Sequence, residues 1–371
     1  MTPGLPIRIV VKLGTSTLTA GTPNLSAPRL VELVRQMAAL RTDGRDVLVV
    51  SSGAIAVGRE RLHFPQLPAE IPAKQMLAAV GQPRLMSLYE QLFGLYGLTV
   101  AQVLLTRADL ADRRRYLNSR NTLSALLAHG VIPIVNENDT VATEEIRVGD
   151  NDTLSAFVAN LIEADLLILL TDQPGLFTAD PRLDPTAILV EEISNPEIPE
   201  ALWAAAGGSG NRLGTGGLYT KLQAADLARR SGTTVVIAHG SDPDVILRLA
   251  AGEILGTRLQ PTVSALESRK RYILAAGRAA GSVQVDDGAA NALRGGGSLL
   301  PVGIRQVSGN FERGDTVRVL DPAGRQIARG LVNYASIDLQ RICGVKSEAI
   351  TQILGFDYGA EVIHRNNMVL L

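Results

Sequence analysis

The 371-residue sequence has very few of the residues that build disulfide frameworks and metal centres. It contains one cysteine and four histidines, and no two histidines are spaced like a pair of metal ligands. A single cysteine excludes an internal disulfide and a four-cysteine zinc site. The histidines are therefore expected at the surface or at helix ends. These five residues are Cys343, His63, His129, His239 and His364.

The sequence also lacks a large net charge and a long apolar run. Lysine and arginine number 36 against 37 aspartates and glutamates, so there is no basic excess of the kind that marks nucleic-acid-binding proteins. No apolar run reaches the ~18 residues of a membrane span, and the N-terminus has no signal-peptide pattern. With 46% hydrophobic residues the chain can bury a large core. A soluble cytoplasmic protein of two or three domains is expected.

Short apolar runs alternate with helical patterns in the first 258 residues. The runs at 7–13, 47–50, 98–105, 131–135, 165–170 and 235–238 are typical of buried strands. Strands that alternate with helices predict an α/β domain, whose mostly parallel sheet is sandwiched by helices.

Polar residues follow four of these strands. In open parallel sheets, ligands bind beyond the carboxyl ends of the strands, which all lie at one edge. Each polar end alone is compatible with an ordinary loop, but four together indicate a site. A lysine within an apolar strand also needs a partner for its amine. The residues are Lys12 with Gly14, Ser52 with Gly53, Asn136 with Asp139, and Thr171 with Asp172.

A further polar cluster, Asp150, Asn151 and Asp152, follows Gly149 and precedes an apolar helical run. Asp152 is well placed to cap that helix through its side-chain oxygen. A cap needs only one such residue, so three in a row favour a functional role. A solvated loop with one cap is the alternative.

A glycine-rich loop at 214–217 precedes another helical pattern that contains Lys221. Glycines before a helix expose N–H groups to a phosphate, and the lysine adds a positive charge. The spacing fits neither a Walker loop nor a dinucleotide-binding loop. The loop alone is weak evidence, and the match with Lys12 strengthens it.

These motifs together resemble the amino-acid kinase family, in order and over essentially the whole chain. The stretches at 10–16, 52–54, 136–139, 149–152 and 214–217 carry the resemblance, with 105–109 and 171–173. The Asn-Glu-Asn-Asp and Gly-Asp-Asn-Asp motifs resemble those of glutamate 5-kinases in particular. The resemblance implies transfer of the γ-phosphoryl group of ATP to the side-chain carboxylate of L-glutamate, the first step of proline biosynthesis.

The resemblance also implies roles for single residues. Lys12 and Lys221 would flank the transferring phosphoryl group, and Asp152 would hold the lysines. The expected glutamate-binding residues are Ser52, Asn136, Asp139 and Asn151. The expected ATP-binding residues are Lys12, Gly14, Thr171, Asp172, Thr215, Gly216, Gly217, Leu218, Tyr219, Thr220 and Lys221. Mg²⁺ would arrive with ATP and be held largely by its phosphates and by water, with no metal ligand assigned to the protein. No general base is needed, because a carboxylate is already ionised at pH 7.

The pattern changes towards the C-terminus. Short strands are expected at 282–285, 303–307, 316–320 and 326–333, with turn signals between them. The stretches at 299–304, 311–315 and 329–330 resemble a PUA domain, a small β-barrel. We expect a catalytic domain at 1–258, a linker at 259–278 and the PUA domain at 279–371.

Two other functions stay open. One is a sibling kinase for aspartate, acetylglutamate or carbamate. The other is RNA binding through the PUA domain. The basic excess of that region is only slight and its aromatic residues are few, which argues against this function. The resemblance further implies a homo-oligomer, inhibition by proline, and functional coupling to glutamyl-phosphate reductase.

Overall fold

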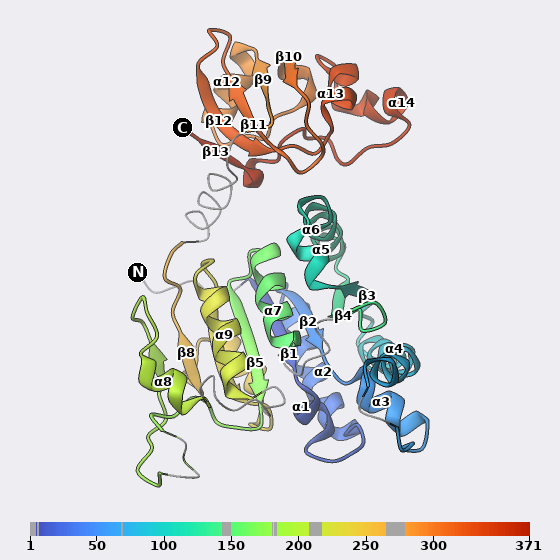
Figure 1. Ribbon diagram of the computed structural model, residues 1–371, viewed down its shortest axis with the longest axis vertical. Helices are drawn as coiled ribbons and strands as arrows, with labels where there is room; N and C mark the ends of the chain where they lie inside the picture. Colours follow the sequence, from blue (N-terminus) through green and yellow to red (C-terminus); the bar gives the residue numbers. More distant parts are fainter. Residues whose placement is uncertain are drawn as a thin grey trace. The chain divides into compact units, whose positions relative to one another are not determined.

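The computed structural model describes residues 5, 7–67, 70–142, 150–179, 181, 184–207, 217–264 and 279–371 (Figure 1). The chain divides into two compact units. One comprises Met1–Asp112 with Asn118–Ser264, and the other Arg113–Leu117 with Ala265–Leu371. Within the described residues, no helix has the length and apolarity to cross a membrane.

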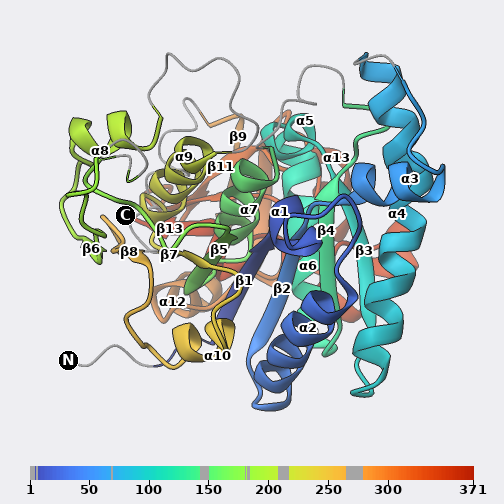
Figure 2. The ribbon, with the colours of Figure 1, turned by 90° about the horizontal axis from the view of Figure 1, so that it is seen from below.

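The first unit is built on an eight-stranded sheet. Its strands are β1 (Arg8–Leu13), β2 (Asp46–Ser51), β3 (Val100–Leu105), β4 (Ile132–Glu137), β5 (Leu166–Thr171), β6 (Glu192–Ile193), β7 (Thr234–His239) and β8 (Thr257–Leu259). Figure 2 shows them in the order β3-β4-β2-β1-β5-β7-β8-β6. All neighbours are parallel except β7 and β8. The predicted mostly parallel sheet is confirmed.

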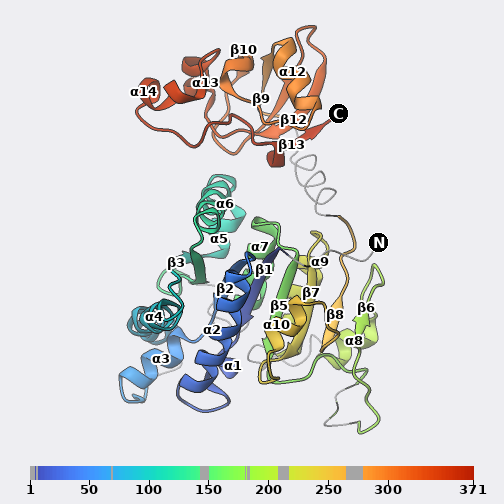
Figure 3. The same ribbon diagram turned by 180° about the vertical axis from the view of Figure 1, so that it is seen from behind.

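Helices cover both faces of this sheet. They are α1 (Thr15–Thr19), α2 (Ala27–Thr42), α3 (Ala54–Arg61), α4 (Ile71–Gly94), α5 (Arg107–Ala111), α6 (Arg113–Ala128), α7 (Asp150–Leu161), α8 (Glu200–Ala205), α9 (Leu218–Arg229) and α10 (Val245–Ala250). Figure 1 shows α7 and α9 in front of the sheet, and Figure 3, from behind, shows α2 and α10 in front. The central strands are therefore buried on both sides, which explains their continuous apolar sequences.

Helices α3 and α4 touch through two glycines. A Cβ on Gly81 would lie 1.8 Å from the carbonyl oxygen of Ala54, and one on Gly58 would lie 1.9 Å from that of Leu77. Only glycine permits such a close backbone approach. Because α3 begins directly after Gly53, this contact fixes α4 against the loop that ends β2.

The second unit contains a five-stranded sheet in the order β10-β9-β11-β12-β13. The strands are β9 (Gly281–Val285), β10 (Ile304–Gly309), β11 (Thr316–Leu320), β12 (Gln326–Leu331) and β13 (Met368–Leu370). Only β9 and β11 pair in parallel. The helices of this unit are α12 (Asp287–Arg294), α13 (Ser336–Ile342) and α14 (Ile350–Leu354), with short 3-10 turns at Pro301–Gly303, Ser347–Ala349 and Arg365–Asn367.

The four predicted C-terminal strands are confirmed, whereas β13 and the helices were not predicted. Strand β8 was also missed. It has only three residues, too few for a periodic pattern. Most of the expected linker, residues 265–278, lies outside the described residues. The boundaries at 258 and 279 therefore remain predictions.

Candidate active site

The polar strand ends lie at one edge of the sheet. Lys12 in β1 pairs in register with Val50 of β2 on one side and with Leu169 of β5 on the other. Because all three strands run in parallel, the residues that follow them emerge together. The sequence prediction that these ends share an edge is confirmed.

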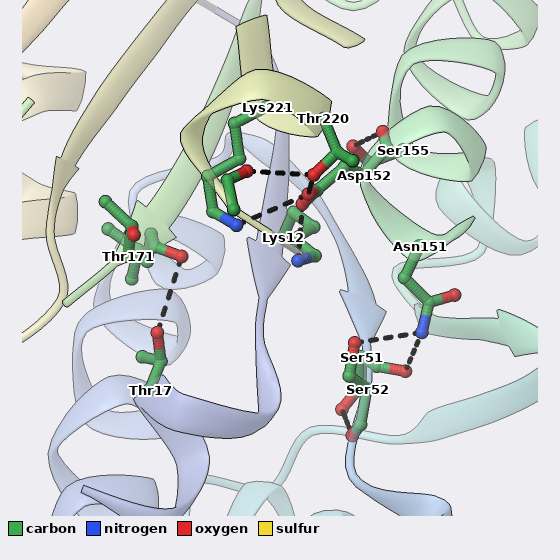
Figure 4. A network of polar contacts seen from close by, with 12 residues as sticks. Lys12, Thr17, Ser51, Ser52, Asn151, Asp152, Ser155, Thr171, Thr220 and Lys221 are labelled. Carbon is green, nitrogen blue, oxygen red and sulfur yellow. Dashed lines mark hydrogen bonds and ion pairs between the residues drawn. The ribbon is translucent and has the colours of Figure 1, made fainter. Parts of the chain in front are cut away.

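A buried cluster of two lysines and one aspartate occupies this edge (Figure 4). Lys12 Nζ lies 2.5 Å from Asp152 Oδ1, and Lys221 Nζ lies 3.3 Å from Asp152 Oδ2. The hydroxyl of Thr220 donates to the same Oδ2 at 2.8 Å. The Asp152 side chain is fully buried, and the lysine side chains are 5% and 7% exposed. Asp152 thus holds both amines close together.

The charges in this cluster do not cancel. Burial lowers the pKa of Lys12, and the neighbouring charge of Lys221 lowers it further, while Asp152 opposes both effects. Burial alone would raise the pKa of Asp152, but the two lysines hold it below its ordinary value. Two cations beside one anion leave a positive site, which suits an incoming phosphoryl group.

Asp152 does not cap helix α7, so that expectation was wrong. The helix begins at Asp150, and Asp152 lies within its first turn. There its carboxylate binds Lys12, Lys221 and Thr220. An acidic residue in a first turn also interacts favourably with the helix dipole.

On the other side of β1, amide side chains form a connected network. Asn151 Nδ2 donates to Ser52 Oγ at 3.0 Å, to the carbonyl of Ser51 at 3.3 Å and to Asn136 Oδ1 at 2.9 Å. Asn136 Nδ2 in turn donates to Gln82 Oε1 at 2.8 Å. Three of the four residues expected to bind glutamate are therefore linked by hydrogen bonds.

The fourth residue, Asp139, follows β4 in a turn and is partly buried. Burial raises the pKa of its carboxyl group to about 6. Within the described part of the chain, no hydrogen bond or salt bridge to this carboxylate is present. A partly buried carboxylate of this kind favours a cationic partner.

The expected nucleotide residues lie on the β5 and α9 side. Thr171 Oγ1 donates to Asp172 Oδ1 at 3.1 Å. Gly217 precedes the first residue of α9, and the first turn of that helix brings Thr220 and Lys221 to Asp152 at this edge. A Cβ on Gly14 would lie 3.4 Å from Lys12 Nζ, so glycine leaves room beside the amine. Of the predicted residues, Gly149, Thr215 and Gly216 lie outside the described residues.

Comparison with known proteins agrees with this geometry. The model of the amino acid kinase family matches residues 8–239, and that of the PUA domain matches residues 281–354. The chain belongs to the amino acid kinase family.

Close relatives of this amino acid kinase cover nearly its whole length. The "Glutamate 5-kinase" of Vibrio campbellii is 56% identical over 367 residues, which are 99% of this chain and 96% of the relative. That of Deinococcus radiodurans is 55% identical over 366 residues, 98% of this chain and 100% of the relative. That of Herpetosiphon aurantiacus is 55% identical, with 98% of each chain covered.

Two residues of this amino acid kinase site carry no signal in the sequence. Gln82 and Tyr89 lie inside the long helix α4, outside every motif. Gln82 contacts Asn136, and the Tyr89 hydroxyl lies 2.8 Å from Ser51 Oγ. Among the residues expected to bind ATP, Leu218 and Tyr219 open α9, and the Tyr219 ring packs edge-on against Trp203 with 5.6 Å between centroids.

Proposed function

We propose that this amino acid kinase is a glutamate 5-kinase. It transfers the γ-phosphoryl group of ATP to the side-chain carboxylate of L-glutamate and forms L-glutamyl 5-phosphate, the first step of proline biosynthesis. The observation that carries the proposal is the buried cluster of Lys12, Asp152 and Lys221 beside the Asn136–Asn151 network. The full-length relatives named glutamate 5-kinase support it.

The reaction needs charge stabilisation more than proton transfer. A glutamate carboxylate oxygen bonds to the γ-phosphorus while the bond from that phosphorus to the bridging oxygen of ADP breaks. The nucleophile is already ionised at neutral pH, so no base has to remove a proton. Lys12 and Lys221 are held by one carboxylate at the same edge, where two amines can neutralise charge on the transferring group.

The amino group of glutamate is bound on the other side of β1. A buried ammonium needs acceptors, and an anionic one gives the strongest hydrogen bond. Asp139 supplies the anion, while Ser52, Asn136 and Asn151 supply neutral polar groups. The raised pKa of Asp139 supports this assignment, because a bound cation would stabilise the carboxylate that burial destabilises.

ATP occupies the side formed by β5 and α9, near Thr171, Asp172 and the first turn of α9. Mg²⁺ comes with ATP as part of that substrate. Among the described residues there is no group of three or more His, Cys, Asp or Glu side chains that could hold a metal. Mg²⁺ usually accompanies nucleotides on phosphate oxygens and water, and we assign it that place here.

The second unit is assigned a structural or regulatory role, since every residue proposed for catalysis lies in the first unit. We assign the enzyme to the cytoplasm as a homo-oligomer. Its product is a reactive acyl phosphate, which supports functional coupling to a glutamyl-phosphate reductase that consumes it.

A substrate panel tests the proposal. The purified protein is incubated with ATP, Mg²⁺, hydroxylamine and one candidate acceptor, because hydroxylamine traps acyl phosphates as hydroxamates. L-Glutamate should give hydroxamate much faster than aspartate, acetylglutamate or carbamate. Preference for one of those acceptors would identify a sibling kinase. Tight, salt-sensitive RNA binding without any kinase activity would refute the assignment.

A further inference from the structure

The amide network beside the cluster has a fixed direction. The backbone N–H of Glu137 donates to Asn136 Oδ1 at 2.9 Å. A backbone N–H can only donate, so this side-chain atom has to be the oxygen. The other end of the Asn136 amide is then nitrogen, and its partner at 2.8 Å, Gln82 Oε1, has to accept.

The same reasoning fixes Asn151. Its atom that faces Asn136 Oδ1 at 2.9 Å must be nitrogen, because the partner is an acceptor. That nitrogen also faces Ser52 Oγ and the carbonyl of Ser51. Asn151 Oδ1 therefore points away from the network. It is buried and has no hydrogen-bond partner among the described residues.

A buried acceptor without a donor is unfavourable by itself, which points to a donor that arrives with a ligand. The following step rests on the proposed function. At neutral pH both carboxylates of L-glutamate are ionised and accept hydrogen bonds only, so its α-ammonium is its sole donor. The ammonium is thus the group of glutamate that matches Asn151 Oδ1.

We propose that Gln82 is a positioning residue for the amino-acid substrate. Its Oε1 holds the Asn136 amide, and Asn136 in turn holds Asn151 with its Oδ1 directed at the α-ammonium. Without an acceptor at Gln82, Asn136 Nδ2 loses its partner, and the Asn136 amide is no longer held from both ends. The orientation of Asn151 then weakens as well.

The location of Gln82 suits a rigid support. The preceding residue, Gly81, packs against the Ala54 carbonyl so closely that no side chain fits there. Ala54 is the first residue of α3, two positions after Ser52. Gln82 and Ser52 are therefore carried by backbone segments in direct contact. Gln82 accepts from Asn136 and Ser52 accepts from Asn151, so each holds one member of the amide pair.

Two substitutions and one control test this role in the full-length enzyme. Gln82→Met keeps the length of the side chain but removes the acceptor. Gln82→Glu keeps an oxygen that can accept from Asn136. Gln91→Met is the matched control, since Gln91 lies exposed on the same helix and its side chain donates a hydrogen bond to Ser87, outside the amide network. Steady-state kinetics with each substrate varied in turn give kcat and both KM values, and thermal unfolding reports stability.

Gln82→Met should raise the KM for glutamate roughly five- to hundredfold, the effect of leaving one buried polar group without its partner. Its KM for ATP should change less than about twofold, because the nucleotide side of the site does not contact Gln82. Gln82→Glu should stay within about threefold of wild type, and Gln91→Met should match wild type.

Three results would overturn the inference: an unchanged glutamate KM in Gln82→Met, equal damage in Gln82→Met and Gln82→Glu, or a parallel rise of both KM values. The wild-type hydroxamate assay separates this test from the proposed function. If the wild type preferred another amino acid, the proposed function would be refuted, but the inference about Gln82 would not. The same variants would then be compared on that amino acid, since the inference requires only an α-ammonium.

Discussion

Asp139→Asn should stabilise the protein and weaken glutamate binding at the same time. The burial of Asp139 raises the pKa of its carboxyl group from 3.8 to about 6. The folded state therefore holds this proton more tightly than the unfolded state, and stability falls as the pH rises from about 4 to about 6. Above pH 6 the ionised, buried carboxylate opposes folding.

The size of this effect follows from the shift. Two pKa units correspond to about 3 kcal/mol at most, and partial exposure of the side chain reduces this to about 1–2 kcal/mol. Asn has nearly the same shape and carries no charge. At pH 7.5 Asp139→Asn should therefore raise the thermal midpoint by about 3–6 °C, since 1 kcal/mol shifts a domain of this size by roughly 2–4 °C. The gain should shrink towards pH 4.

The same ionisation should appear in catalysis. With a pKa of about 6, roughly a quarter of Asp139 is ionised at pH 5.5 and nearly all of it at pH 7.5. If only the ionised form binds the ammonium, the KM for glutamate should fall about fourfold over this range. Glutamate itself does not change charge there, because its carboxyl groups titrate lower and its ammonium higher. Asp139→Asn should have a higher KM that no longer depends on pH.

The assays are scanning calorimetry and steady-state kinetics at pH 5.5, 6.5 and 7.5, with Asp43→Asn as the control at an exposed aspartate. Saturating glutamate should stabilise the wild type more than the variant, because a ligand stabilises the state it binds. The reasoning is refuted if Asp139→Asn is less stable than wild type at pH 7.5 and glutamate KM in the wild type is the same at all three pH values.

Three further predictions concern the rest of the first unit. Lys12→Ala should lower kcat by roughly 10²–10³. The variant should still fold, because Asp152 keeps Lys221 as a partner. Near-normal kcat in the folded variant would show that Lys12 is an ordinary strand-end lysine. A chain that ends at Ser264, and so keeps β8, should still phosphorylate glutamate, and a folded but inactive protein at every Mg²⁺ concentration would contradict this. Gly81→Ala should lower the free energy of unfolding, measured in urea, by at least about 2 kcal/mol, since the added Cβ would overlap the Ala54 carbonyl. A decrease of less than about 0.5 kcal/mol would contradict the close contact.

The sequence predicted the parts of the site that depend on strands. Lys12 and Asp139 each follow or end an apolar run, and parallel strands bring such ends to one edge without further information. The partnership of Asp152 with both lysines was implied only by the family resemblance. Its atoms come from segments far apart in the chain, and no local pattern encodes that contact.

Gln82 could not be predicted because its role depends on packing. Nothing in the sequence of α4 distinguishes it from Gln75 or Gln91 on the same helix. Its position follows from the Gly81 contact with α3, which is a tertiary feature. The capping position considered for Asp152 was wrong for a similar reason, since the pattern of a helix start does not show whether a carboxylate has a stronger partner elsewhere. The functional role favoured for the same residue came from the polar cluster and the family resemblance.

The central place of β1 in the sheet has a consequence for inhibitor chemistry. The amino-acid side that we propose is carried by β2 and β4, and the proposed nucleotide side by β5 and α9. Strand β1, with Lys12, lies between β2 and β5. A single molecule that joined a dicarboxylate to a nucleotide would therefore run across the strands and not along them. From β2 to β5 there are two interstrand steps, about 10 Å in all. A linker of that length, with a negative charge over Lys12, would let one molecule bind the amino-acid side and the nucleotide side at once. With a shorter linker, the molecule should lose its contacts on one of the two sides.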